Sequence, residues 1–133
     1  MSDASTRSGP GRILVAVYAV FALAATARSS VQIGTDFDNA PLAYSLSAVA
    51  AAIYILATVA LARGGWARPL AWAACTAEAV GVFTVGTLSI VASDHFPDAT
   101  VWSVYGQGYG YVPAVLPFLG LAWLWRTREG HAG

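Results

Sequence analysis

Two ionisable side chains lie inside long apolar stretches of this sequence, and they are its clearest candidates for chemistry. Glu78 lies within the apolar run 69–91, and Arg28 lies within the run 13–33. A charged side chain near the centre of a membrane helix costs about 2.5–3.5 kcal/mol on insertion scales. Each of these residues is therefore expected to have a structural partner or a function, such as binding a proton or a cation.

The two side chains come within reach of one another if the two runs form neighbouring helices. At helical rise, Glu78 lies about 14 Å and Arg28 about 22 Å from the same edge of the apolar layer. A long arginine side chain covers much of that difference. Residues three and four apart share a helix face, which adds Gln32 and Tyr54 as partners. We therefore predict an intramembrane polar cluster of Arg28, Gln32, Tyr54 and Glu78.

This cluster has two main interpretations. One is a structural ion pair or hydrogen-bond network that fixes the register of the helices. The other is a proton-binding carboxyl group coupled to the movement of a solute. An unpaired, protonated Glu78 is a third alternative, and it would also be structural.

The composition indicates which solvent surrounds these groups. The 133 residues are 57% hydrophobic and 11% charged, and the mean hydropathy is +0.60. Soluble domains carry about 25% charged residues, so this chain could not cover its surface in water. The formal net charge is zero, which argues against nucleic acid as a partner. The expected partners are the lipid bilayer and, in addition, other membrane proteins or further copies of the chain.

Four apolar segments are candidates for membrane-spanning helices, at about 13–33, 41–61, 69–91 and 105–125. A span needs about 20 apolar residues to cross a hydrocarbon core of about 30 Å. The apolar part of the fourth segment, 111–125, covers only about 22 Å and must borrow residues back to 105. Strands of a membrane β-barrel alternate apolar and polar residues, whereas these segments are continuously apolar. The predicted fold class is all-α, an integral membrane bundle of four transmembrane helices spanning residues 13–125.

The arginines predict the orientation of the bundle, because cytoplasmic loops keep an excess of basic residues. Six of them fall on one side of the predicted spans: Arg7, Arg12, Arg63, Arg68, Arg126 and Arg128. The opposite loops carry no arginine or lysine, and they contain Asp36, Asp38, Asp94 and Asp98. The protein is therefore expected in a bacterial plasma membrane. Both termini, with polar tails 1–12 and 126–133, are expected on its cytoplasmic side. Trp102 and Tyr105 are expected at the outer interface.

The first span has a competing interpretation. Arg12, the apolar run and the small residues Ala25–Ala27 also resemble a secretory signal with its cleavage site, which would remove residues 1–27. The apolar character resumes beyond that site, at Val31 to Ile33, which favours an uncleaved span.

Glycine and proline are concentrated before and within the fourth span, at Gly106, Gly108, Gly110, Pro113 and Pro117. We predict an outer entrance to a helix that bends at the prolines, whose freed carbonyls are satisfied by neighbouring helices. A potassium-channel filter is disfavoured, because "GQGYG" lacks the preceding threonine and valine.

Two stripes of small residues suggest which helices are neighbours. Spacing of four, which allows close approach of membrane helices, recurs at Ala22, Thr26, Ser30 and Gly34, and again at Ala73, Ala77 and Gly81. These stripes predict that spans one and three are adjacent.

The sequence contains no motif for catalysis, a cofactor or a metal. It has no phosphate loop, dinucleotide fingerprint, nucleophile elbow or zinc helix motif. The single cysteine, Cys75, lies among alanines and is expected to be a packing residue. The acidic loop around His95 lacks a defined ligand spacing and is expected to be solvated surface.

The chain resembles a group of small integral membrane proteins of high-GC actinobacteria. The resemblance covers about residues 12–125 and is carried by "YAVFALAATA" before Arg28, by "TDFDNAPLAYSLSAVAA" and by "HFPDATVWSVYGQGYGYVP". The resemblance implies a four-helix membrane protein. It implies no particular activity, because none is assigned to this group. The chain is also similar in size to small multidrug resistance transporters, but their essential glutamate lies in the first helix, whereas Glu78 lies in the third.

From these features we expect a non-catalytic accessory or assembly component of the plasma membrane. The alternative is a small oligomeric transporter or channel that uses Glu78 as a proton or cation site. An enzyme acting on a lipid-soluble substrate is a more distant third.

Overall fold

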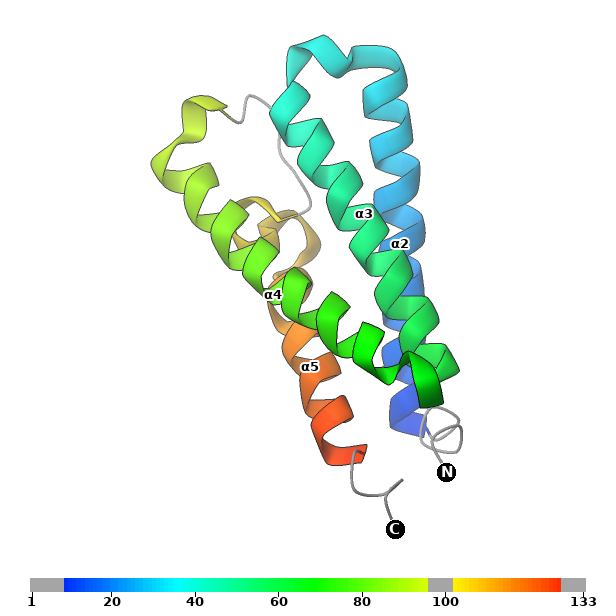
Figure 1. Cartoon of the computed structure of the whole chain (residues 1–133). Helices are drawn as coiled ribbons and strands as arrows, with labels where there is room; N and C mark the ends of the chain where they lie inside the picture. The colour runs from blue at the N-terminus through cyan, green and yellow to red at the C-terminus, as the bar shows by residue number, and fades with distance from the viewer. Residues whose placement is uncertain (1–8, 96–101, 128–133) are drawn as a thin grey trace.

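The computed structural model describes residues 9–95 and 102–127, and every regular element in this part is helical. The four α-helices are α2 (Gly9–Asp36), α3 (Pro41–Arg63), α4 (Arg68–Val91) and α5 (Val112–Thr127). Figure 1 shows them as one bundle, with the beginning of α2 and the end of α5 at the same end. The all-helical prediction is confirmed.

Local sequence explains where the helices begin and end. Proline occupies the first turn of both α3 and α4, where its missing N–H removes no helical hydrogen bond. Gly64, with φ of 63°, ends α3 in a conformation that glycine adopts without steric cost. Short 3-10 turns, η1 (Phe37–Asn39) and η2 (Gly65–Ala67), therefore suffice to connect consecutive antiparallel helices.

In the part of the chain that is described, three helices are long and apolar enough to cross a membrane: α2, α3 and α4. They contain 28, 23 and 24 residues. The fourth helix, α5, has 16 residues and begins at Val112 rather than at 105. At helical rise its length is about 24 Å, less than the hydrocarbon core of about 30 Å.

The segment before α5 forms the 3-10 element η4 (Ser103–Tyr109), which turns into the bundle. Its backbone is left-handed at Val104, Tyr105 and Gly106, with φ of 48°, 59° and 86°. A β-branched residue such as valine rarely adopts positive φ, so surrounding contacts must hold this turn in place. Figure 1 shows η4 beside α4, with α5 continuing below it.

Trp102, just before η4, corrects the sequence prediction. Its side chain is only 2% exposed. Its ring lies against Gly81 of α4, where an added Cβ would come within 2.5 Å of the ring. The prediction of an outer-interface tryptophan is therefore wrong. The glycine leaves room for the indole, and burying that ring removes a large apolar surface from solvent.

The helices pack in chain order: α2 against α3, α3 against α4, and α4 against both η4 and α5. Spans one and three meet at Tyr18 of α2 and Cys75 of α4, whose side chains lie 3.5 Å apart, but the predicted stripes of small residues do not form this contact. Ala73 and Ala77 of α4 are exposed, and Gly81 is covered by Trp102. In an alanine-rich chain, small residues at spacing of four also occur on outward faces.

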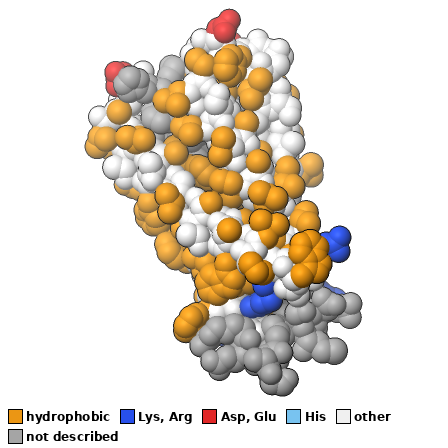
Figure 2. Space-filling model, in the orientation of Figure 1, with side chains coloured by type: hydrophobic (Ala, Val, Ile, Leu, Met, Phe, Trp, Pro, Cys, Tyr) orange, Lys and Arg blue, Asp and Glu red, His pale blue; other side chains and the backbone are white. Residues whose placement is uncertain are grey.

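The surface has apolar sides and charged ends. Figure 2 shows hydrophobic side chains along the flank, acidic groups at the upper end and arginine toward the lower end. Val20, Leu23 and Phe83 are among the large apolar side chains that remain 46–74% exposed. Contiguous apolar surface of this kind marks an interaction with a membrane or another protein.

Candidate functional site

Glu78 lies at the centre of the site. It occupies the middle of α4 and is 0% exposed. Within residues 9–95 and 102–127, neither carboxyl oxygen has a hydrogen bond of normal distance and angle, although the Tyr18 hydroxyl is close enough to interact with the carboxyl group. A buried polar group without a partner is uncommon in folded proteins, so this one requires an explanation.

Tyr18 of α2 is the polar residue next to Glu78, close enough for an electrostatic interaction. Its hydroxyl donates to the Leu116 carbonyl of α5 at 3.3 Å and lies 3.5 Å from Cys75 Sγ. A tyrosine has a single O–H, so the one donated to Leu116 is not available to Glu78. A hydrogen bond between Tyr18 and Glu78 would therefore need the proton of the carboxylic acid.

An aromatic series extends from Tyr18 toward η4. The ring centroids of Tyr18 and Tyr54 are 6.3 Å apart, and those of Tyr54 and Trp102 are 6.4 Å apart. Trp102 Nε1 donates to the Tyr54 hydroxyl at 3.0 Å. The three residues come from α2, α3 and the segment before η4. Their contacts therefore link these three parts of the chain inside the bundle.

The predicted polar cluster is brought together only in part. Tyr54 and Glu78 both lie next to Tyr18, at 0% exposure. Arg28 does not hydrogen-bond to Glu78, because neither carboxyl oxygen has a partner. Arg28 follows Tyr18 by 10 residues on α2, which is about 15 Å along the axis. Gln32 lies about 21 Å from Tyr18 by the same rise.

Gln32 belongs instead to a separate polar group near the acidic end of α2 and α3. Its Oε1 is buried without a partner in the described part of the chain, as are the hydroxyls of Thr26, Ser29 and Ser47. Three of these residues lie on α2 and one lies on α3, and the two helices pack against each other.

The glycine and proline residues pack closely. Gly106 faces Pro113, and an added Cβ would come within 2.7 Å of the proline ring. Gly110 has φ of 64° and ends η4, which contains Gly108. Pro113 lies in the first turn of α5, and Pro117 lies inside the helix, both buried. The role of this segment as an outer entrance stays a prediction.

Hydrogen bonds hold the left-handed turn of η4 on α4. The Val104 N–H donates to Ser89 Oγ at 2.8 Å, and Ser89 Oγ donates to the Gly86 carbonyl at 2.8 Å. The Tyr105 hydroxyl lies 2.9 Å from Thr87 Oγ1. The first of these contacts satisfies a backbone N–H of the non-helical turn, which would otherwise lack a partner inside the protein.

Sequence reasoning missed two residues of the site, Tyr18 and Trp102. Tyr18 shares a helical face with Arg28, so periodicity signals its inward direction but not its level relative to Glu78. Trp102 carries no local signal of burial. Gly81 provides the space for it, but that relation is visible only in the fold.

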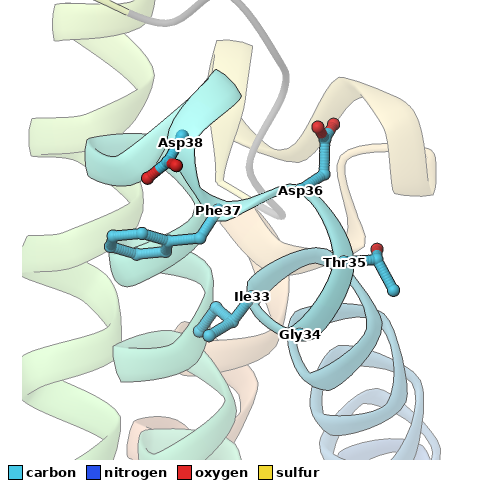
Figure 3. A pocket seen from close by; sticks show the side chains of 6 residues that line it. All are labelled: Ile33, Gly34, Thr35, Asp36, Phe37 and Asp38. Carbon is cyan, nitrogen blue, oxygen red and sulfur yellow. The ribbon is translucent and has the colours of Figure 1, made fainter.

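A pocket separate from Glu78 lies at the acidic end of the bundle, at the turn from α2 into η1 (Figure 3). Its volume is about 330 Å³, and its lining includes Asp36 and Asp38. Figure 3 shows these carboxylates pointing in different directions. Asp36 Oδ2 accepts from the Tyr44 hydroxyl at 3.3 Å. The two aspartates therefore do not converge on one ligand position.

Within residues 9–95 and 102–127, no three His, Cys, Asp or Glu residues come together as metal ligands. Comparisons with protein-family models, curated proteins and solved structures find no match. The class defined by the fold is a helical bundle with three helices able to cross a membrane.

Proposed function

We propose that this chain is a non-catalytic integral component of a bacterial plasma membrane that assembles with other membrane proteins. The proposal includes a four-span topology, cytoplasmic termini and membership of the actinobacterial group that the sequence resembles. It is supported by the apolar flank and by the position of arginines and aspartates at opposite ends.

The outward face of α2 is the observation that carries the assembly role. Six exposed residues follow a spacing of four, three, four, three and four, and most are small: Ala16, Val20, Leu23, Ala27, Ser30 and Gly34. Small residues at such spacing let a second membrane helix approach closely. None of them is needed for packing inside the bundle, since all are exposed.

Bulky substitution on this face tests the proposal. Ala27→Leu should reduce association with a partner or a second copy by at least tenfold, because the larger side chain keeps the helices apart. Ala52→Leu is the matched control, since Ala52 is also exposed but lies on α3. Association is measured by cysteine-independent cross-linking in native membranes, followed by mass spectrometry. Equal cross-linking of wild type and Ala27→Leu would refute the assembly role.

The second candidate function is a small oligomeric transporter or channel that uses Glu78. The observation that favours it is the fully buried carboxyl group without a hydrogen-bond partner in the described chain. An ionisable residue in the membrane interior is a functional candidate by default. The protonated carboxyl group of Glu78 can donate a hydrogen bond to the Tyr18 hydroxyl.

Glu78→Gln distinguishes the two candidates. The amide keeps the shape of the side chain but cannot exchange a proton with a solute pathway. Loss of proton-linked flux in proteoliposomes, with assembly unchanged, would support transport. Absence of flux in both wild type and Glu78→Gln would instead support the assembly role.

A further inference from the structure

An apolar groove lies between α2 and α5, which pack less extensively against each other than the consecutive helices do. Its volume is about 700 Å³. Its lining from α2 is Ile13, Leu14 and Val17, and α5 contributes most of the rest. The groove extends along α5 from Val112 to Arg126, which is about 21 Å at helical rise.

The lining is apolar except at one end. Among residues 9–95 and 102–127, Arg126 is the single charged residue that lines the groove, and no carboxylate of this part of the chain lines it. Arg12, next to Ile13 on α2, is exposed at the same end. The groove therefore combines an apolar channel with a positive end, which is the arrangement that basic pockets between membrane helices use for anionic lipid headgroups.

We propose that this groove binds one anionic phospholipid, with an acyl chain along Val115 and Leu119 and its phosphate at Arg126. One leaflet of the hydrocarbon core is about 15 Å deep, so a groove of about 21 Å accommodates its acyl chains. The proposal requires only that the bundle lies in a bilayer. It does not depend on a protein partner.

The side chains that flank the groove favour a lipid over another helix. Close helix packing in membranes uses small residues. Here the flanking side chains include Ile13, which is 66% exposed, and Leu119, which is 53% exposed. These branched groups keep a second backbone away but leave space for a flexible acyl chain. The small-residue face of α2, by contrast, points to a different side of that helix.

Native mass spectrometry of the detergent-solubilised protein tests the lipid site. Phosphatidylglycerol and phosphatidylcholine with identical acyl chains are added at equal concentration. Wild type should retain phosphatidylglycerol preferentially. Arg126→Gln should reduce that preference about fivefold, which corresponds to about 1 kcal/mol for one arginine near an anionic surface. Arg63→Gln, at an exposed arginine outside the groove, should leave the preference unchanged.

A second variant tests the apolar part of the groove. Ala122→Trp places an indole in the groove and should reduce retention of both lipids, because Ala122 lines it and is exposed. Equal retention of the two lipids by wild type would overturn the proposal. Equal losses in the Arg126 and Arg63 variants would also overturn it, as would a second protein chain that excludes lipid from the groove.

A measurement on wild type alone guards against a variant that fails to fold. Raising the salt concentration screens the electrostatic attraction between exposed charges. The ratio of retained phosphatidylglycerol to retained phosphatidylcholine should therefore fall toward one. A preference unaffected by salt would show that the phosphate does not bind an exposed arginine, and the proposal would fail.

Discussion

Gly120 marks the closest approach of α5 to the buried core. A Cβ added there would lie 2.7 Å from Cys75 Sγ and 3.1 Å from the Tyr18 hydroxyl. Cys75 and Tyr18 are both 0% exposed, so neither side chain can move out into solvent. Gly120→Ala should therefore destabilise the bundle by about 2 kcal/mol, the usual cost of overpacking a core.

Removing the sulfur should relieve this clash. Cys75→Ala alone leaves a small cavity and should cost about 1 kcal/mol. If the two substitutions act independently, the double variant Gly120→Ala/Cys75→Ala should lose about 3 kcal/mol of unfolding free energy. If Gly120 and Cys75 are in direct contact, it should lose only about 1 kcal/mol, because the new methyl group occupies the space of the sulfur. The unfolding free energy is measured by titration of the solubilised protein with a denaturing detergent.

Gly34→Ala is the matched control for this cycle. Gly34 also lies in a helix, but nothing is within 4 Å of a Cβ added there. Its replacement should not destabilise the bundle and should gain up to about 1 kcal/mol from helix propensity. Additive losses for Gly120→Ala and Cys75→Ala would refute the proposed contact between α4 and α5.

Two further substitutions test contacts between elements. Arg68→Gln should lower the unfolding free energy by about 1–2 kcal/mol, because Arg68 Nη2 donates to the Leu124 carbonyl at 2.7 Å. The control is Arg63→Gln, measured in the same titration. It should lower the unfolding free energy less, since Arg63 is exposed over the ring of Trp66. Trp102→Phe should cost about 1 kcal/mol through the lost hydrogen bond to the Tyr54 hydroxyl. An unchanged midpoint in the thermal unfolding of Trp102→Phe would contradict that contact.

Much of the helical architecture could be predicted because its causes are local. The runs 13–33, 41–61 and 69–91 lie within the helices that the structure forms, and Pro41 begins α3 as expected. Apolar length and proline position act within a few turns, so they can be read without knowledge of the fold.

The candidate site could be predicted only by residue and not by arrangement. Periodicity correctly directs Tyr54 and Glu78 inward, but it contains no information on the axial offset between two helices. That offset places Tyr18 at the level of Glu78 and leaves Arg28 about 15 Å along α2 from Tyr18.

The sequence by itself determined that the chain is helical, that the runs 13–33, 41–61 and 69–91 are apolar throughout most of their length, and that Arg28 and Glu78 interrupt two of them. Tertiary structure alone decided that residues 103–109 turn into the bundle and that Trp102 covers Gly81. The reason is physical: the left-handed backbone at Val104 is unfavourable in isolation and persists because Ser89 and the core hold it. Contacts between residues far apart in the chain therefore set the surroundings of Glu78.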